Sequence, residues 1–136
     1  MNQISSSDII SSHSPQKHVR RFGFAFQGII HVILNEANFR VHLLTACFVS
    51  ILAYVLRFST SEWAILLVTI GLVLASEMVN SAMEELTDHL VKEHHEGVRI
   101  VKDVAAGSVL ISAIISVIIG IILFVPKITP ILYNVK

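Results

Sequence analysis

The apolar residues of this chain gather into three long runs that polar segments separate. The runs cover residues 39–57, 63–85 and 104–125, and the last contains 22 consecutive uncharged residues. A helix of about 20 residues, rising 1.5 Å per residue, crosses the roughly 30 Å hydrocarbon core of a bilayer. The pattern therefore predicts three transmembrane helices. Trp63 suits an interfacial anchor, and Pro126 is expected to end the third helix.

The segments outside these runs are more polar. Residues 16–38 alternate basic and apolar side chains, which predicts an amphipathic helix lying in the membrane interface. A soluble helix packed on a partner is the alternative. Residues 1–15 are rich in serine and are expected to form a disordered tail, and residues 127–136 a short C-terminal tail. The membrane domain would then comprise residues 16–126.

The composition agrees with an all-α membrane protein. Of the 136 residues, 54% are hydrophobic and 15% are charged, and the mean hydropathy is +0.73. These values are too apolar for an ordinary soluble domain of this length. The net charge is zero, so no overall positive field points to a nucleic acid as a partner.

Lysine and arginine residues predict the orientation in the membrane. Seven lie before the first span, at its start, or between the second and third spans, and three lie on the opposite side: Lys17, Arg20, Arg21, Arg40, Lys92, Arg99 and Lys102 against Arg57, Lys127 and Lys136. Cytoplasmic segments carry the excess of positive charge. The N-terminus and the 86–103 loop are therefore predicted to be cytoplasmic, and the C-terminus outside.

A column of polar residues interrupts the second apolar run. It consists of Glu77, Asn80, Ser81, Glu84 and Asp88, which stand 0, 3, 4, 7 and 11 positions along. At about 100° per residue they fall within a helical stripe roughly 100° wide. An acid at membrane depth costs about 2.5 kcal/mol or more unless it is paired, hydrated or bound to a metal. We interpret the column as a functional site, with a solvated helix end as the alternative.

Further polar residues flank the predicted spans at the same interface. They are Glu36, Glu93, His94, His95, Glu96, Arg99, Lys102 and Asp103. Carboxylates without cysteines suit a hard cation such as Mg²⁺. Because His94 and His95 are adjacent, they do not share a helix face, and a histidine metal site is not favoured. The sequence has no Gly-rich phosphate loop, which excludes a P-loop or protein-kinase type of nucleotide site.

Three motifs resemble one known family. They are Glu36-Ala37-x-Phe39-Arg40, Glu77-x-x-Asn80-Ser81-Ala82-x-Glu84-x-x-x-Asp88, and Lys102-Asp103. Together they resemble the prokaryotic diacylglycerol kinase and undecaprenol kinase family over residues 17–125. The resemblance implies a homotrimer with a surface helix and three transmembrane helices per chain. It also implies active sites at the cytoplasmic interface, built from neighbouring chains, that transfer the γ-phosphate of ATP to a lipid hydroxyl.

The resemblance also implies roles for individual residues. Glu77 corresponds to the general base, which would contact the lipid substrate, and Glu36 and Glu84 to the carboxylates that hold the nucleotide's magnesium. Asn80 and Asp88 correspond to supporting polar residues. The residues implied to contact nucleotide are Lys17, Phe24, Glu36, Glu84, Glu93, His94, His95, Lys102 and Asp103.

The acceptor lipid is the least determined part of the prediction. The segment from Phe22 to Ile29, the pattern Glu36-x-Asn38-x-Arg40-x-His42 and Glu62-Trp63 resemble the undecaprenol kinase branch. We therefore expect an enzyme of the bacterial inner membrane that makes undecaprenyl phosphate. The alternative within the family is a diacylglycerol kinase that makes phosphatidic acid. A small ion or proton carrier and a structural membrane subunit are the alternatives from other classes.

Overall fold

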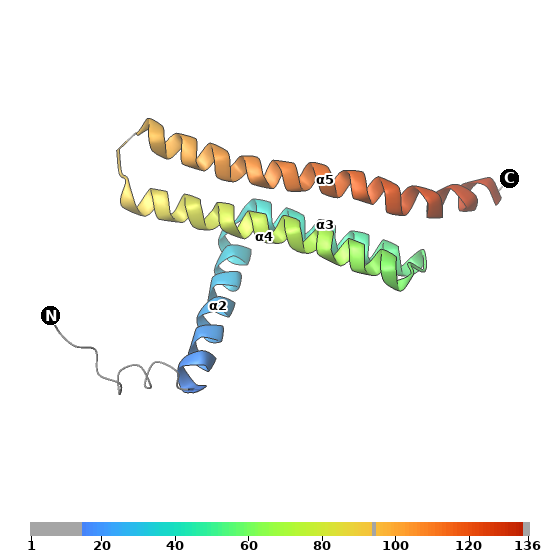
Figure 1. Ribbon diagram of the computed structural model, residues 1–136, viewed down its shortest axis with the longest axis horizontal. Helices are drawn as coiled ribbons and strands as arrows, with labels where there is room; N and C mark the ends of the chain where they lie inside the picture. The colour runs from blue at the N-terminus through green and yellow to red at the C-terminus, as the bar shows by residue number, and fades with distance from the viewer. Residues whose placement is uncertain (1–14, 94, 135–136) are drawn as a thin grey trace. The chain divides into compact units, whose positions relative to one another are not determined.

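A computed structural model describes residues 15–93 and 95–134, and every regular element in these ranges is a helix. The helices are α2 (Pro15–Asn35), α3 (Ala37–Val55), α4 (Thr60–Leu90) and α5 (Glu96–Asn134). The chain divides into two units, Met1–Asn35 and Glu36–Lys136. Figure 1 shows α3, α4 and α5 running side by side in the second unit. The predicted N-terminal tail lies largely outside the described residues.

Helix α2 forms the described part of the first unit. Phe22, Phe24 and Phe26 are exposed along it, and the Arg20 guanidinium lies 5.5 Å from the centre of the Phe24 ring. The helix ends earlier than the predicted residue 38. At its end, the Asn35 side-chain amide donates to the His31 backbone carbonyl at 2.8 Å. The Asn35 side chain thus bonds to the backbone of its own last helical turn.

The turn between α3 and α4 is stabilised by two helix caps. Arg57 has a positive φ of 54°, and the backbone N–H groups of Arg57 and Phe58 donate to Tyr54 and Ala53 as in a Schellman motif. Ser59 then caps α4. Its hydroxyl accepts from the Glu62 backbone N–H, and the Glu62 carboxylate accepts from the Ser59 N–H at 2.7 Å. This reciprocal capping box fixes a short turn and makes α3 and α4 antiparallel neighbours.

The main apolar core lies at this end of the helices. Phe58 packs against Phe124 of α5, with ring centres 4.8 Å apart, and meets Trp63 of α4 edge-on. The Lys127 ammonium lies 3.0 Å from the Glu62 carboxylate and 5.8 Å from the centre of the Phe58 ring. Aromatic packing and this ion pair therefore tie the C-terminal part of α5 to the start of α4.

Three helices of the described chain are long and apolar enough to cross a membrane, which agrees with the three predicted spans. Their bounds differ from the prediction at the α4–α5 end and at the C-terminal end of α5. Helix α4 continues to Leu90, and α5 begins at Glu96, so both extend well past the apolar runs. The polar residues at these ends therefore lie on helices and not in the loop that joins them.

The prediction that Pro126 ends the last helix is wrong. Helix α5 continues through Pro126 and Pro130 to Asn134. Each proline removes one backbone donor, which leaves the carbonyls of Ile122 and Pro126 without their usual helical partner. Membrane helices accept proline because side-chain hydroxyls and local adjustments satisfy the freed carbonyls.

Replacing the cap of α4 tests this account of the turn. Ser59→Ala should lower the free energy of unfolding by about 1 kcal/mol, because the Glu62 N–H loses its acceptor. The measurement is unfolding of the detergent-solubilised protein in a denaturing-detergent titration. Ser61→Ala changes an exposed serine of the same helical turn and should leave the midpoint in place. An equal effect of both substitutions would contradict the capping role.

Candidate functional site

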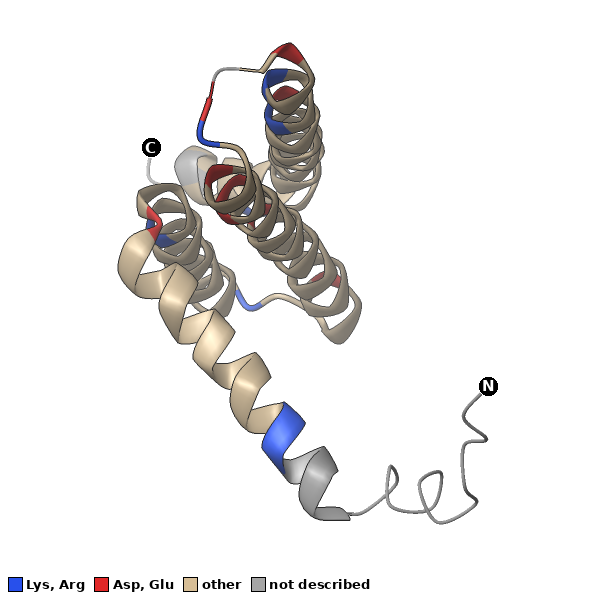
Figure 2. Ribbon diagram, turned by 90° about the vertical axis from the view of Figure 1, so that its left-hand side faces the viewer, with Lys and Arg blue, Asp and Glu red and all other residues tan. Residues whose placement is uncertain are grey.

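The polar column of α4 points into the protein. Glu77 is 3% exposed, Ser81 5% and Asn80 6%, although the chain is a bundle of only three long helices at this point. Glu84 is half-buried and Asp88 is exposed, so burial decreases towards the α4–α5 loop. Figure 2 shows acidic residues along this end of α4 and charged residues at the start of α5. The predicted stripe is therefore a real face of the helix, and its innermost member is a carboxylate.

Glu77 has charged neighbours but no direct partner. Within the part of the chain that the structure describes, its carboxylate makes no hydrogen bond and no ion pair. His42 on α3, Glu84 on α4 and Glu36 lie close enough to interact with it electrostatically. Glu36 is the N-cap residue of α3, where the backbone is extended. The α3 helix thus brings one acid and one imidazole to the buried acid of α4.

Asn80 links the buried and half-buried parts of the column. Its side-chain N–H donates to Glu84 Oε1 at 2.9 Å, which fixes the orientation of the amide. Its oxygen, Oδ1, is then buried without a hydrogen-bond partner among the described residues. Buried polar atoms are almost always satisfied, and an orphaned acceptor points to a missing donor or cation. The described residues contain no group of three His, Cys, Asp or Glu side chains placed to hold a metal ion.

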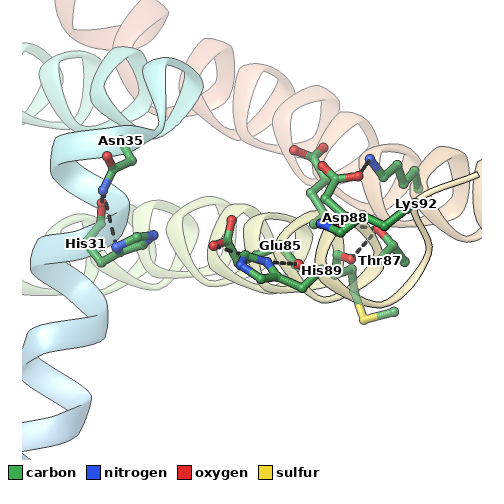
Figure 3. A network of polar contacts seen from close by, with 10 residues as sticks. His31, Asn35, Glu85, Thr87, Asp88, His89 and Lys92 are labelled. Atoms are coloured by element: carbon green, nitrogen blue, oxygen red, sulfur yellow. Dashed lines mark hydrogen bonds and ion pairs between the residues drawn. The ribbon is translucent and has the colours of Figure 1, made fainter.

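The α4–α5 loop brings the two helix ends together through charge. The Lys102 ammonium of α5 pairs with the Asp88 carboxylate of α4, and the Lys92 ammonium donates to the Asp88 backbone carbonyl at 3.0 Å. Figure 3 shows Asp88 and Lys92 together at the end of α4. On α5, the Arg99 guanidinium donates to Asp103 at 2.7 Å and also pairs with Glu96. Both residues of the predicted Lys102-Asp103 motif are therefore engaged in ion pairs.

The other residues predicted to contact nucleotide make no described contact with the polar column of α4. Glu93 and His95 are exposed in and beside the α4–α5 loop, and the His95 ring accepts from the Gly97 backbone N–H at 3.1 Å. Phe24 is exposed on α2, which belongs to the other unit. His94 and the side chain of Lys17 lie outside what the structure describes. The roles predicted for these residues stay predictions.

Sequence reasoning did not include His42 among the site residues. Its imidazole acts on Glu77 from the facing helix, and it also lines a cavity between α3, α4 and α5. A signal was present in the sequence. Counting from the tight turn near residue 58, His42 stands 16 positions before it and Glu77 stands 19 positions after it. Two antiparallel helices therefore bring these residues to a similar depth.

Comparison with known proteins gives one consistent family. The family model for prokaryotic diacylglycerol kinase matches residues 23–124. The undecaprenol kinase of Bacillus subtilis strain 168 is 37% identical over 108 residues, covering 79% of this chain and 88% of that relative. A diacylglycerol kinase of Synechocystis is 37% identical over 106 residues, covering 77% and 61%. The diacylglycerol kinase of Escherichia coli K12 is 30% identical over 105 residues, covering 77% and 86%.

The burial of Glu77 predicts that this residue destabilises the fold. Glu77→Gln should raise the free energy of unfolding by about 1 kcal/mol or more, because a neutral amide is cheaper to bury than an unpaired carboxylate. The measurement is the unfolding midpoint in detergent at neutral pH. Glu85→Gln is the matched control, since Glu85 is an exposed acid two turns further along the same helix. A lower midpoint for Glu77→Gln than for the control would contradict the argument.

Proposed function

The chain belongs to the prokaryotic diacylglycerol kinase family and is a lipid kinase, and we propose that it transfers the γ-phosphate of magnesium-bound ATP to undecaprenol. The observation that carries the proposal is the buried carboxylate of Glu77, with His42, Glu36 and Glu84 close to it. The Bacillus subtilis relative, an undecaprenol kinase, supports this acceptor by its 37% identity over most of its length. The product would be undecaprenyl phosphate.

Glu77 serves as the general base in this proposal. The lipid hydroxyl oxygen forms a bond to the γ-phosphorus, the bond from that phosphorus to the β-phosphate oxygen breaks, and ADP leaves. The hydroxyl proton goes to the Glu77 carboxylate. Because this carboxylate makes no hydrogen bond or ion pair among the described residues, its oxygens are free to accept that proton. Positioned proton transfer of this kind contributes about 10²–10⁴-fold to a rate.

The residues around Glu77 suit the magnesium of the nucleotide. Mg²⁺ is usually held by one or two carboxylates and completes its shell with water and substrate phosphate. Glu84 and Glu36 supply carboxylates near Glu77, and the unpaired Oδ1 of Asn80 supplies a buried oxygen beside Glu84. When bound, the ion would neutralise charge on the transferring phosphate. The Asn80 amide meanwhile holds Glu84 in place through the 2.9 Å hydrogen bond.

The ion pairs at the α4–α5 end suit the nucleotide phosphates. Lys102 pairs with Asp88, and a phosphate can replace Asp88 as the partner of its ammonium group. An ammonium group binds phosphate as a point charge. Asp103 is held by Arg99, which orients it at the start of α5. Glu93, His94, His95, Lys17 and Phe24 complete the nucleotide contacts in this proposal.

Helix lengths support a site at one membrane surface. If Trp63 marks one interface, Glu77 stands about 21 Å further along α4, inside a hydrocarbon core of roughly 30 Å. Glu84 stands at the far boundary, and Asp88 stands beyond it. A base at this depth can meet a lipid hydroxyl while the rest of the lipid stays in the bilayer. The excess of Lys and Arg in the 86–103 loop supports a cytoplasmic location for this surface.

The proposed kinase also has an expected placement in the membrane and an expected assembly. Helix α2, with Phe22, Phe24 and Phe26 exposed, would lie in the membrane interface. The C-terminus would lie outside, in a bacterial inner-membrane protein. We further propose a homotrimer in which neighbouring chains complete each active site, following the family resemblance of the motifs at Glu36, Glu77 and Lys102.

Diacylglycerol is the second candidate acceptor, because the Synechocystis and Escherichia coli relatives are diacylglycerol kinases. The product would then be phosphatidic acid. An ion carrier is less well supported. The hydroxyls of Ser108, Ser112 and Ser116 on α5 each donate to a carbonyl of their own helix and provide no path of free polar groups.

A phosphoryl-transfer assay tests the proposed function. Purified protein in mixed micelles with labelled ATP and Mg²⁺ should label undecaprenol with a higher kcat/KM than diacylglycerol. Glu77→Gln should lower kcat by about 10²-fold or more, because the hydroxyl proton loses its acceptor. Glu85→Gln should keep normal turnover. Faster transfer to diacylglycerol would replace the proposed acceptor, and no transfer to either lipid would refute the kinase function.

The metal assignment is tested at Glu84. Glu84→Gln should raise the Mg²⁺ concentration needed for half-maximal rate by about tenfold or more, because a neutral amide replaces a charged ligand. The rate at saturating Mg²⁺ should recover in part. Glu85→Gln again provides the control, since Glu85 is exposed on the neighbouring position of the helix. An unchanged Mg²⁺ titration would remove Glu84 from the set of ligands.

A further inference from the structure

A cavity of about 220 Å³ lies between α3, α4 and α5, next to the polar column. It exceeds the roughly 150 Å³ of an apolar cavity that binds benzene. Its polar lining consists of His42, Thr45, Thr69 and Ser116, and the rest of its wall is aliphatic, aromatic or glycine. A hydrocarbon unit of about five carbons therefore fits its volume and most of its chemistry.

The hydroxyl groups of the wall are already committed as donors. Those of Thr45, Thr69 and Ser116 each donate to a backbone carbonyl of their own helix, at 2.9, 2.7 and 2.8 Å. None of these protons is left for a ligand carbonyl. A carbonyl oxygen placed in this cavity beyond the reach of His42 would lose its hydrogen bonds, whereas a hydrocarbon has none to lose.

The cavity begins one helical turn from the proposed base. Val73 and Leu74 line it, and Glu77 follows them by four and three residues on α4. His42 also lines it and lies close enough to Glu77 to interact with it electrostatically. The opposite end is formed by Leu66 and Phe124, beside the apolar core. A lipid whose hydroxyl meets Glu77 can thus place the carbons that follow the hydroxyl in the cavity.

We propose that this cavity holds the hydrocarbon that directly follows the hydroxyl of the lipid substrate, and that it selects a prenol over a diacylglycerol. The inference rests on the proposed kinase function. In a prenol the carbon that carries the hydroxyl belongs to an isoprene unit, and everything beyond the hydroxyl is apolar. In a diacylglycerol the same region carries two esters, whose carbonyl oxygens find no free hydroxyl donor in the wall.

The bilayer strengthens this form of selection. Lipid tails are as apolar as leucine, so a hydrocarbon gains little by moving from the bilayer into an apolar cavity. Affinity for a chain as such therefore cannot separate the two lipids, because both carry long chains. The loss suffered by the ester groups can separate them, since an apolar pocket disfavours a ligand that brings an additional polar group into it by about 10²-fold.

Filling the cavity at Gly120 tests the inference. Gly120 lines the cavity, and a Cβ at this position would meet no atom within 4 Å, so a larger side chain has open space to enter. Gly120→Leu should lower the ratio of kcat/KM for undecaprenol to that for diacylglycerol by about tenfold or more. Gly71→Leu is the matched control. Its Cβ also meets open space, it lies on α4, and it does not line the cavity.

The outcomes separate the inference from the proposed function. A wild-type protein that phosphorylates neither lipid overturns the kinase function and the inference with it. An active wild type whose lipid ratio is unchanged by Gly120→Leu, or changed equally by Gly71→Leu, overturns the inference alone. An equal loss of activity towards both lipids also overturns it, because the cavity would then not select.

A second measurement uses the wild-type protein and therefore does not depend on whether a substituted protein folds. A prenol that carries a diazirine on its first isoprene unit should crosslink to residues of the cavity wall, such as Leu74 and Val117. Excess undecaprenol should suppress these crosslinks, and excess phosphatidylcholine should not. Crosslinks confined to residues outside the wall, or suppression by phosphatidylcholine, would show that the first isoprene unit does not occupy the cavity specifically.

Discussion

The burial of one carboxylate governs this structure. Glu77 is 3% exposed, and the described residues give it neither a hydrogen bond nor an ion pair. A charged group at membrane depth costs about 2.5 kcal/mol or more. The buried hydroxyls between these helices bond their own backbone, whereas Asn80 Oδ1 is also buried without a partner among the described residues. The Glu77 carboxylate is thus kept available for a reaction partner from outside the chain.

The stabilising contacts and the proposed catalytic residues lie at opposite ends of the helices. At the α3–α4 end, a Schellman turn, a capping box and the Phe58 cluster satisfy the helix termini and bury aromatic surface. At the α4–α5 end, Asn80 Oδ1 has no partner among the described residues, and Lys102 is held by an exposed acid. An exposed ion pair contributes little to stability. The lysine is therefore available to phosphate at small cost, while the opposite end holds the helices in register.

The sequence predicts the elements and the face of α4 well, because both depend on local periodicity. Three apolar runs became three long helices, and the spacing from Glu77 to Asp88 predicted one helical face. The bounds were less predictable, because α5 continues through Pro126 and Pro130 although each proline frees one carbonyl. The pairing of Asp88 with Lys102 and the approach of His42 to Glu77 depend on the packing of different helices, which no local pattern specifies. The roles in nucleotide binding and the trimer came from resemblance, and they stay proposals.

The membrane environment also changes what makes an active site selective. In water, an apolar cavity favours any ligand that removes hydrocarbon from solvent, whereas in a bilayer the hydrocarbon has already left the water. The remaining distinction between two lipids is whether their polar groups find partners. In this chain the hydroxyls of Thr45, Thr69 and Ser116 are bonded to backbone, and the ionisable groups lie at the Glu77 end of the cavity. A lipid whose only polar group is a hydroxyl at the end of an apolar chain fits this arrangement. Its hydroxyl meets Glu77, and only hydrocarbon enters the apolar part of the cavity.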